Sequence, residues 1–233
     1  MDLRGKLWFS HIGLFVTDIE KMVGFYTRFL GFTVSDRGKH ANGEIVFMTR
    51  DSSEHHQLVF ATGRPADLAF NVVNQISFRL DGLATLRALH VALKDEPVKI
   101  LGPVTHGNAL SSYFLDPEGT RVELLIGTPW YVPQPCRLPV DLALPDEQLW
   151  ASIEERVRSM PGFMTHADWQ RAIEQNFAVA SSRRTLTRST PHFFRPAARK
   201  KTPPAGGVFV LPREVRVTQP SSPPSRDREC RSP

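Results

Sequence analysis

The first half of the sequence runs twice through the same order of expected elements: a strand, a helix and then three strands. The first copy covers about residues 7–62 and the second about residues 72–127. The run HIGLFV in the first copy aligns with QISFRL in the second, which places His11 opposite Gln75. Such a repeat restricts this part of the chain to two modules of similar fold, although few residues are identical between them.

Start and stop signals define the elements of the first copy. A strand-like run over residues 7–16 is followed by Thr17 and Asp18, which supply N-cap chemistry for a helix. Apolar residues then recur at helical spacing, and Gly31 stands where a helix normally ends. Three β-rich runs separated by turn-forming stretches come next, at about 32–36, 44–50 and 56–61.

The second copy repeats these signals, with Asp81 as the expected cap of its helix. Its strands are expected at 73–80, 98–101, 110–115 and 121–126. Aligning the last strands of the two copies places His56 opposite Glu123. We therefore expect an α+β fold in which two tandem βαβββ modules form an open, curled mixed sheet around a central site.

Residues 1–128 are expected to form this two-module domain, and the texture of the sequence changes after it. Residues 129–180 begin with a Pro-rich stretch, which favours an extended arm over a strand in a sheet, followed by a helical extension. Two short helices are expected there, from Asp146 to about Arg158 and from His166 to about Ala178. Residues 181–233 are basic and rich in Pro, Ser and Arg, which predicts a disordered tail.

The charge is unevenly distributed, with a net of +9 in residues 181–233 and −4 in the rest of the chain. The basic pI near 9.5 therefore belongs to the tail, and we expect neither nucleic acid nor membrane as a partner. Two distant cysteines, Cys136 and Cys230, give no disulfide framework. No secretory signal or apolar run of spanning length is present, so the expected location is cytoplasmic.

Four polar residues occupy matched places on the expected strands: His11 and Gln75 on the first strands, His56 and Glu123 on the last. Side chains alternate across a strand, so two modules that curl toward each other can point one residue from each strand into a shared concavity. All four are metal-ligand types, and the set suits Fe(II), Mn(II), Zn(II) or Ni(II). Glu123 lies in the apolar run VELLI, where an unpaired carboxylate would be costly to bury.

The runs HIGLFVTDIEKMVGFYTRFLGFTV, EHHQLVFATG, NQISFRL and THGNALSSYFLDPEGTRVELL resemble the vicinal oxygen chelate superfamily of glyoxalases, bleomycin resistance proteins and extradiol dioxygenases. Within it they resemble the type I extradiol dioxygenases related to biphenyl-2,3-diol 1,2-dioxygenase. The resemblance extends in order over about 120 residues. It implies a ring-cleaving oxidoreductase of aromatic catabolism that brings a catechol-type diol and O2 together on Fe(II), with Mn(II), Zn(II) or Ni(II) as alternatives.

The resemblance also implies roles for individual residues. The metal ligands fall on His11, Gln75 and Glu123. The acid/base falls on His56, with Tyr113 as a second catalytic residue. Substrate contacts fall on His106, Asn108 and Tyr113.

Gln75 departs from the dioxygenase pattern, because NQISF stands where the family has a second His ligand. An amide oxygen is a weaker ligand than imidazole, which makes oxygen activation harder to support. His56 could instead turn inward and act as a ligand. Three functions follow as alternatives: a dioxygenase-like enzyme, a glyoxalase- or epimerase-like metal-dependent lyase or isomerase, and a metal-free protein that binds small aromatic molecules. The Pro-rich arm and its helices could also hold a second subunit in a homo-oligomer.

Overall fold

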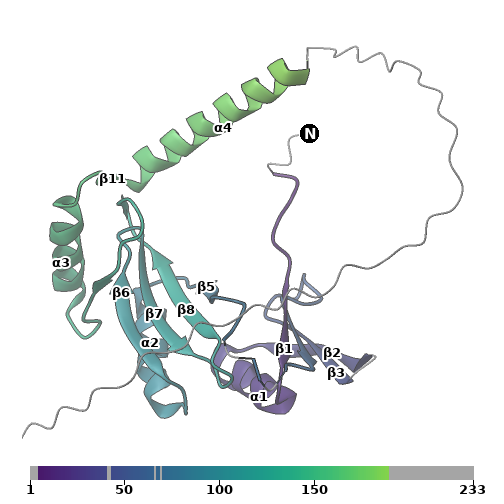
Figure 1. Cartoon of the computed structure of the whole chain (residues 1–233). Coiled ribbons are helices and arrows are strands. Elements are labelled where there is room, and N and C mark those ends of the chain that lie inside the picture. The colour runs from purple at the N-terminus through teal and green to yellow at the C-terminus, as the bar shows by residue number, and fades with distance from the viewer. Residues whose placement is uncertain (1–4, 41–42, 66, 69, 189–233) are drawn as a thin grey trace, which may run out of the picture. The chain divides into compact units, whose positions relative to one another are not determined.

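Both expected modules are present in the structure, a computed structural model that describes residues 5–188 apart from 41–42, 66 and 69 (Figure 1). The α+β class and the tandem βαβββ order are confirmed. The strands pair in two open sheets, one in each module, and not in one continuous sheet. Most of the predicted basic tail, residues 189–233, lies outside the described residues.

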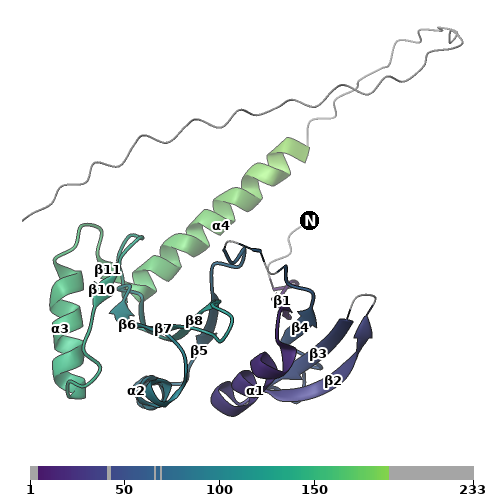
Figure 2. The same ribbon diagram turned by 60° about the horizontal axis from the view of Figure 1, so that its bottom comes forward.

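The first module is a four-stranded sheet in the order β1-β4-β3-β2, with α1 along one face (Figure 2). β1 and β4 run parallel, whereas the other neighbours are antiparallel. The elements are β1 Ile12–Val16, α1 Ile19–Leu30, β2 Thr33–His40, β3 Gly43–Thr49 and β4 Leu58–Thr62.

Local sequence signals set both ends of α1. The Asp18 side chain accepts a hydrogen bond from the backbone N–H of Lys21 at 3.0 Å, as expected of an N-cap. Gly31 ends the helix in the left-handed conformation, with φ of 70°. The helix buries its apolar face, including Met22 and Tyr26, against the sheet. These predicted boundaries are confirmed.

β1 is shorter than the strand-like run 7–16 that contains it. The partner strand offers residues only from Leu58 onward, and the backbone N–H of Ile12 already bonds to the carbonyl of Gln57, just before β4. Apolar residues ahead of Ile12, such as Trp8 and Phe9, are exposed. A strand needs a pairing neighbour as well as a suitable composition, so β1 begins where β4 does.

The second module forms a five-stranded sheet in the order β10-β6-β7-β8-β5, with α2 packed on β7 and β8. Its helix begins after Gly82, which has no side-chain cap bond, so the prediction that Asp81 caps it is wrong. The elements are β5 Ile76–Arg79, α2 Leu83–Ala92, the short 3-10 helix Leu93–Asp95, β6 Ile100–Thr105, β7 Ala109–Leu115 and β8 Arg121–Gly127.

The strand registers of the two modules correspond residue by residue. Ile12 pairs with Leu58 in the first module and Ile76 with Val122 in the second, so both partners are displaced by 64 positions. Glu123 therefore corresponds to Val59, and the prediction that it corresponds to His56 is wrong. The alignment matched two polar residues, whereas the equivalent position in the first module is apolar.

The modules share one core and are joined by polar contacts at the DPEG turn. Phe25 and Phe29 of α1 contact Phe114 of β7, with ring centroids 5.9 and 5.8 Å apart. In the turn, the Glu118 carboxylate accepts hydrogen bonds from the backbone N–H groups that precede α1, and the buried Tyr26 hydroxyl donates to Asp116 at 3.1 Å. The turn thus connects the end of the second module to the helix of the first.

The Pro-rich arm is partly strand. Its residues Leu138–Pro139 form β10, which pairs antiparallel with β6 and adds the fifth strand of the second sheet, so the arm is not wholly outside a sheet as predicted. Pro139 is tolerated there because β10 lies at the sheet edge. Another arm segment, β9 Trp130–Tyr131, pairs with β11 Met164–Thr165.

Two helices follow the arm. α3 spans Asp146–Arg158, as predicted, although the Asp146 side chain pairs with Arg87 and does not cap the helix. α4 spans His166–Arg188 and continues past the predicted end near Ala178 into the segment predicted to be disordered. In the part of the chain that the structure describes, no helix is both long and apolar enough to cross a membrane.

Candidate functional site

A row of polar side chains crosses the open face of the second sheet. The strand register places Ser77 of β5 beside Glu123 of β8, and Glu123 beside Tyr113 of β7. Their strand neighbours Phe114 and Leu124 are fully buried in the core. Because side chains alternate between the faces of a sheet, the three polar residues project together from the opposite face.

Glu123 is the centre of this row and is only 5% exposed. Its Oε1 accepts hydrogen bonds from Ser111 Oγ at 2.7 Å and the Tyr113 hydroxyl at 2.6 Å. Its Oε2 accepts from Ser77 Oγ at 2.6 Å and Gln75 Nε2 at 3.0 Å. All four donors are neutral, so they solvate the buried carboxylate without cancelling its charge.

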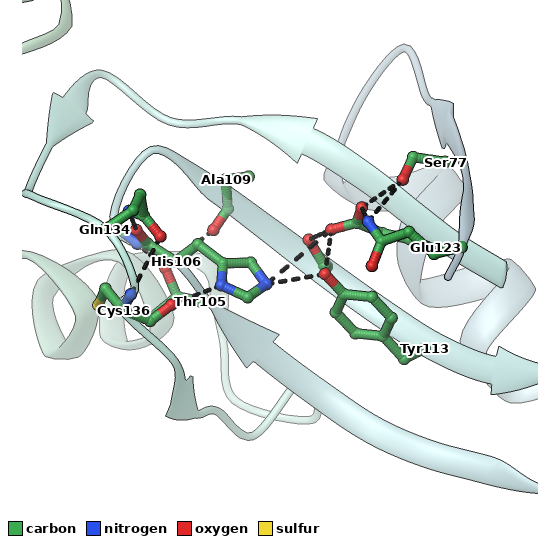
Figure 3. A network of polar contacts seen from close by, with 11 residues as sticks. Ser77, Thr105, His106, Ala109, Tyr113, Glu123, Gln134 and Cys136 are labelled. Carbon is green, nitrogen blue, oxygen red and sulfur yellow. Dashed lines mark hydrogen bonds and ion pairs between the residues drawn. The ribbon is translucent and has the colours of Figure 1, made fainter. Parts of the chain in front are cut away.

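His106 extends the network from Tyr113 to the Pro-rich arm (Figure 3). Its Nδ1 lies 2.5 Å from the carbonyl oxygen of Cys136, which can only accept, so Nδ1 carries a hydrogen. Its Nε2 lies 2.9 Å from the Tyr113 hydroxyl and 3.9 Å from Glu123 Oε1. Tyr113 therefore stands between an imidazole and a carboxylate.

Counting hydrogens allows two arrangements of this network. Before the network takes up a proton, Glu123 is ionised, His106 is neutral, and the single Tyr113 hydrogen can satisfy only one of them. With one proton added, both contacts are satisfied when Glu123 is ionised, Tyr113 donates to Glu123, and His106 donates from Nε2 as an imidazolium. When Glu123 is protonated, it donates to the Tyr113 oxygen, and Tyr113 donates to a neutral His106. The two arrangements differ by the shift of two hydrogens along the chain, so Tyr113 can pass a proton between Glu123 and His106.

The phenol of Tyr113 keeps its hydrogen over the ordinary pH range. Burial, followed by the hydrogen bond and the negative charge of Glu123, raises the pKa of Tyr113 well above its usual value. A group that stays protonated at the centre of the chain can donate on one side while it accepts on the other. It suits a relay better than it suits a general base.

The Pro-rich arm holds His106 in place. The Gln134 side chain donates from Nε2 to the carbonyls of His106, at 2.7 Å, and Val132, at 3.1 Å, and its Oε1 accepts from the backbone N–H of Cys136 at 3.0 Å. Arg137 follows directly, with its guanidinium carbon 5.8 Å from the centroid of the Tyr113 ring. The arm is therefore a wall of the site.

Two cavities of about 800 and 360 Å³ border the network. Both are lined by Gln75, His106, Tyr113 and Arg137. The larger cavity is also bordered by Glu123 and by the exposed residue Asn108, among others. The structure thus brings together five of the predicted site residues: Gln75, His106, Asn108, Tyr113 and Glu123.

The other two predicted site residues form a separate cluster in the first module. The rings of His11 and His56 lie 4.3 Å apart between centroids, and Nδ1 of His56 lies 2.8 Å from Nδ1 of His55. Desolvation and the neighbouring histidines, His11 before His55, lower the pKa of His56. No contact between described residues connects His11 or His56 to Glu123, so the expected central site does not form within one chain.

The described residues of one chain do not offer a complete set of ligands for a divalent metal. Gln75 and Glu123 offer an amide and a carboxylate oxygen, but both ring nitrogens of His106 are engaged by Cys136 and Tyr113. Among the residues described, no three His, Cys, Asp or Glu side chains are grouped so that they could hold a metal. The predicted third ligand, His11, lies in the other cluster.

Several contributors to the network carried no clear signal in the sequence: Ser77, Ser111, Gln134, the carbonyl of Cys136, and Arg137. The two serines could have been found from strand alternation once Glu123 was chosen, because they project from the same face. The arm residues could not, since their contacts depend on the path of a Pro-rich segment.

Residues 8–124 match the family model described as the Glyoxalase/Bleomycin resistance protein/Dioxygenase superfamily. No curated protein matches the chain. The match ends before the arm, so Gln134, Cys136 and Arg137 lie outside the family region.

Similar solved structures each cover about half of the chain. An integron cassette protein from the mobile metagenome of the Halifax Harbour sewage outfall is 24% identical, over 51% of this chain and 97% of its own, with a TM-score of 0.41. A glyoxylase/bleomycin resistance protein/dioxygenase domain from Frankia sp. EAN1pec is 18% identical, over 51% and 96%, with a TM-score of 0.46. The fosfomycin resistance protein FosX from Listeria monocytogenes, complexed with Mn(II) and sulfate, is 20% identical, over 51% and 91%, with a TM-score of 0.42.

Proposed function

Since this chain belongs to the Glyoxalase/Bleomycin resistance protein/Dioxygenase superfamily, also called the vicinal oxygen chelate superfamily, we propose that it is an enzyme that transfers a proton on a small substrate with two adjacent oxygens. The reaction is redox-neutral, of the isomerase, epimerase or lyase type. One observation carries this proposal: the continuous path from Glu123 through Tyr113 to His106, beside a cavity.

Each residue of the path has a distinct task in the proposed reaction. Glu123 borders the cavity and takes a proton from the substrate carbon next to a carbonyl, or returns one to it. Tyr113 passes the proton over contacts of 2.6 and 2.9 Å. His106 stores it, held in one tautomer and orientation by the carbonyl of Cys136.

The neighbours of Glu123 support its use as a base. Ser77 and Ser111 keep the carboxylate in one position, which lowers the cost of reorganisation when its charge changes. Gln75 borders both cavities and can offer its amide to a substrate oxygen. A carboxylate that is buried, oriented by hydrogen bonds and connected to an imidazole is typical of acid–base sites.

The test is exchange of the substrate hydrogen with solvent. When α-hydroxy carbonyl compounds are incubated with the protein in deuterium oxide, the hydrogen next to the carbonyl should exchange for deuterium. NMR spectroscopy of the compounds measures this exchange. Tyr113→Phe should lower kcat by about 10² with little change in KM, because it interrupts the proton path and leaves the cavity wall in place. Tyr131→Phe is the matched control, because Tyr131 stacks on Trp169 and lines neither cavity. Wild-type protein that binds these compounds without exchange would indicate a binding protein and sink the proposal.

A dioxygenase is the second candidate, and the gathering of His106, Asn108 and Tyr113 at one cavity favours it. The sequence resemblance assigns these three residues to the substrate of an extradiol dioxygenase. The superfamily contains many metalloenzymes, and such a reaction would need the predicted ligands His11, Gln75 and Glu123 together. His11 would then come from a second copy of the chain. Uptake of O2 with a catechol panel after anaerobic loading with Fe(II) separates this candidate from the first, which consumes no O2.

A further inference from the structure

Three arginines face the cavities beside Glu123 and lack an acidic partner. Arg121 borders the smaller cavity, Arg79 the larger one, and Arg137 both. No ion pair or hydrogen bond joins any of them to a carboxylate in the described part of the chain. Other arginines, such as Arg64, are paired with acidic side chains. Arg50 and Arg156 also lack a carboxylate partner among the described residues, but they border neither cavity, so what distinguishes the three arginines is their position at the cavities.

The strand positions of Arg79 and Arg121 place them on the face that carries the polar row. Arg79 follows Ser77 by two residues on β5, and Arg121 precedes Glu123 by two residues on β8. The strands are parallel and Ser77 pairs with Glu123, so the two arginines lie on opposite sides of the row along the strand direction. Arg137 approaches from the arm, over the Tyr113 ring.

The cavities are consequently rich in positive charge. Glu123 is the one acidic residue among the described residues that line them, against three arginines and the hydrogen-bonded His106. Guanidinium groups at a concave surface attract anions and disfavour cations. A neutral catechol would leave all three arginines without a partner.

From this charge pattern we infer that the substrate carries a carboxylate and that Arg137 binds it. The two adjacent oxygens of the substrate then face Glu123 and Tyr113. The planar fork of a guanidinium matches a carboxylate through two parallel hydrogen bonds. The Tyr113 ring and the Gln134 contacts limit the positions open to Arg137, which lowers the entropy cost of binding. This inference rests on the proposed function for the site, and it narrows the substrate to small hydroxy or oxo acids.

Arg137 comes from the arm and not from the family region. The family match ends at residue 124, and the arm reaches the cavity because β10 pairs with β6 and Gln134 binds the backbone of His106. The specificity for an anion is thus contributed by a segment that lies outside the family match.

Binding of mandelate and mandelamide to chelator-treated protein, followed by calorimetry, tests the inference. Both compounds have a hydroxyl next to a carbonyl oxygen. They differ in charge, because mandelate carries a carboxylate where mandelamide carries a neutral amide. Wild-type protein should bind mandelate about tenfold more tightly, as expected for one charge-assisted contact. Arg137→Gln should remove this preference, and Arg137→Lys should retain part of it, because lysine keeps the charge without the fork. Raising the salt concentration should weaken binding of mandelate alone.

Arg50→Gln is the matched control. Arg50 is also exposed and also lies 5.8 Å over an aromatic ring, that of Phe32, but it lines neither cavity. The Arg50→Gln variant should therefore keep the wild-type preference for mandelate over mandelamide.

Equal affinity of the wild type for the two compounds, no binding of mandelate, or an unchanged preference in a folded Arg137→Gln variant would overturn the inference. Tighter binding of the corresponding hydroxyphosphonate than of mandelate would overturn the assignment to a carboxylate. Binding needs no turnover, so a preference for mandelate without any hydrogen exchange would count against the proposed reaction alone.

Discussion

The backbone N–H of Thr17 donates to both carboxylate oxygens of Glu118, at 2.7 and 2.9 Å, although the two residues belong to different modules. The N–H of Asp18 donates to the same carboxylate at 2.7 Å, and Arg64 lies 3.3 Å from it. The Glu118 side chain is only 8% exposed. A turn of the second module thus binds the backbone at the start of α1.

Glu118→Gln should destabilise the fold by about 2 kcal/mol, because it removes the charge from the bonds to the backbone donors and from the ion pair with Arg64. The loss is measured as the free energy of unfolding in urea. Glu174→Gln, on the exposed surface of α4, makes the same chemical change as a control and should have little effect. Equal stability of the two variants would show that the Glu118 contacts contribute nothing.

Stability should decrease as the pH falls below 6.5, in part because of His90. Burial, and secondarily the charge of Lys94, lowers the pKa of His90 below its usual 6.5, while its Nδ1 lies 2.8 Å from Ser112 Oγ. Between the usual and the lowered pKa, the unfolded chain binds a proton that the folded chain does not, so acid favours unfolding. The contribution becomes constant once the pH is below the lowered pKa.

His90→Gln should lose this part of the pH dependence. Urea unfolding at one pH above 6.5 and one below it should give a smaller difference for the variant than for the wild type. His166→Gln, at the half-buried residue that begins α4, is the control. An identical pH difference in wild type and His90→Gln would contradict the prediction.

Replacing Glu123 should reveal how much of the network depends on its charge. Glu123→Leu removes the acceptor that Ser77, Ser111 and Tyr113 share and should cost about 3 kcal/mol, whereas Glu123→Gln keeps an acceptor oxygen and should cost less. Thermal unfolding of both variants provides the comparison. Should Glu123→Leu prove as stable as the wild type, the hydrogen bonds to Glu123 would be dispensable for folding.

The predicted ligands His11 and Glu123 do not meet within the described residues of one chain, so a metal held by both would need two copies, and subunit mixing can test this. His11→Ala and Glu123→Gln should each bind Mn(II) weakly, whereas a co-refolded mixture should contain one intact site per heterodimer. Electron paramagnetic resonance of bound Mn(II) measures the recovery without reference to activity. A mixture that binds no more metal than its two components would rule out a site shared between copies.

Local signals in the sequence were sufficient for much of the fold. The ends of α1 depend on Asp18 and Gly31 themselves, so they could be predicted. The start of β1 could not, because it depends on where β4 offers partners. The correspondence of Val59 with Glu123 was hidden for a related reason: strand register is a property of paired backbones, and an apolar residue at a matched place gives no signal.

The site could be predicted only in part, because the sequence gives signals for single residues but not for how the modules and the arm pack. Glu123 was conspicuous as a carboxylate in an apolar strand, and the residues expected near it gathered there. His11 and His56 did not, because the alignment carried no information on how the modules pack. The carbonyl of Cys136 is a backbone group that any residue would supply, so its contact with His106 depends only on the path of the arm.

The row Ser77–Glu123–Tyr113 has a counterpart in the first module, where the same register brings together Gly13, Val59 and Phe47. The backbone is duplicated, but the chemistry is not. The molecule is therefore a duplicated scaffold that carries the polar row in one half only, and Val59→Glu would be the first step toward building a second such row.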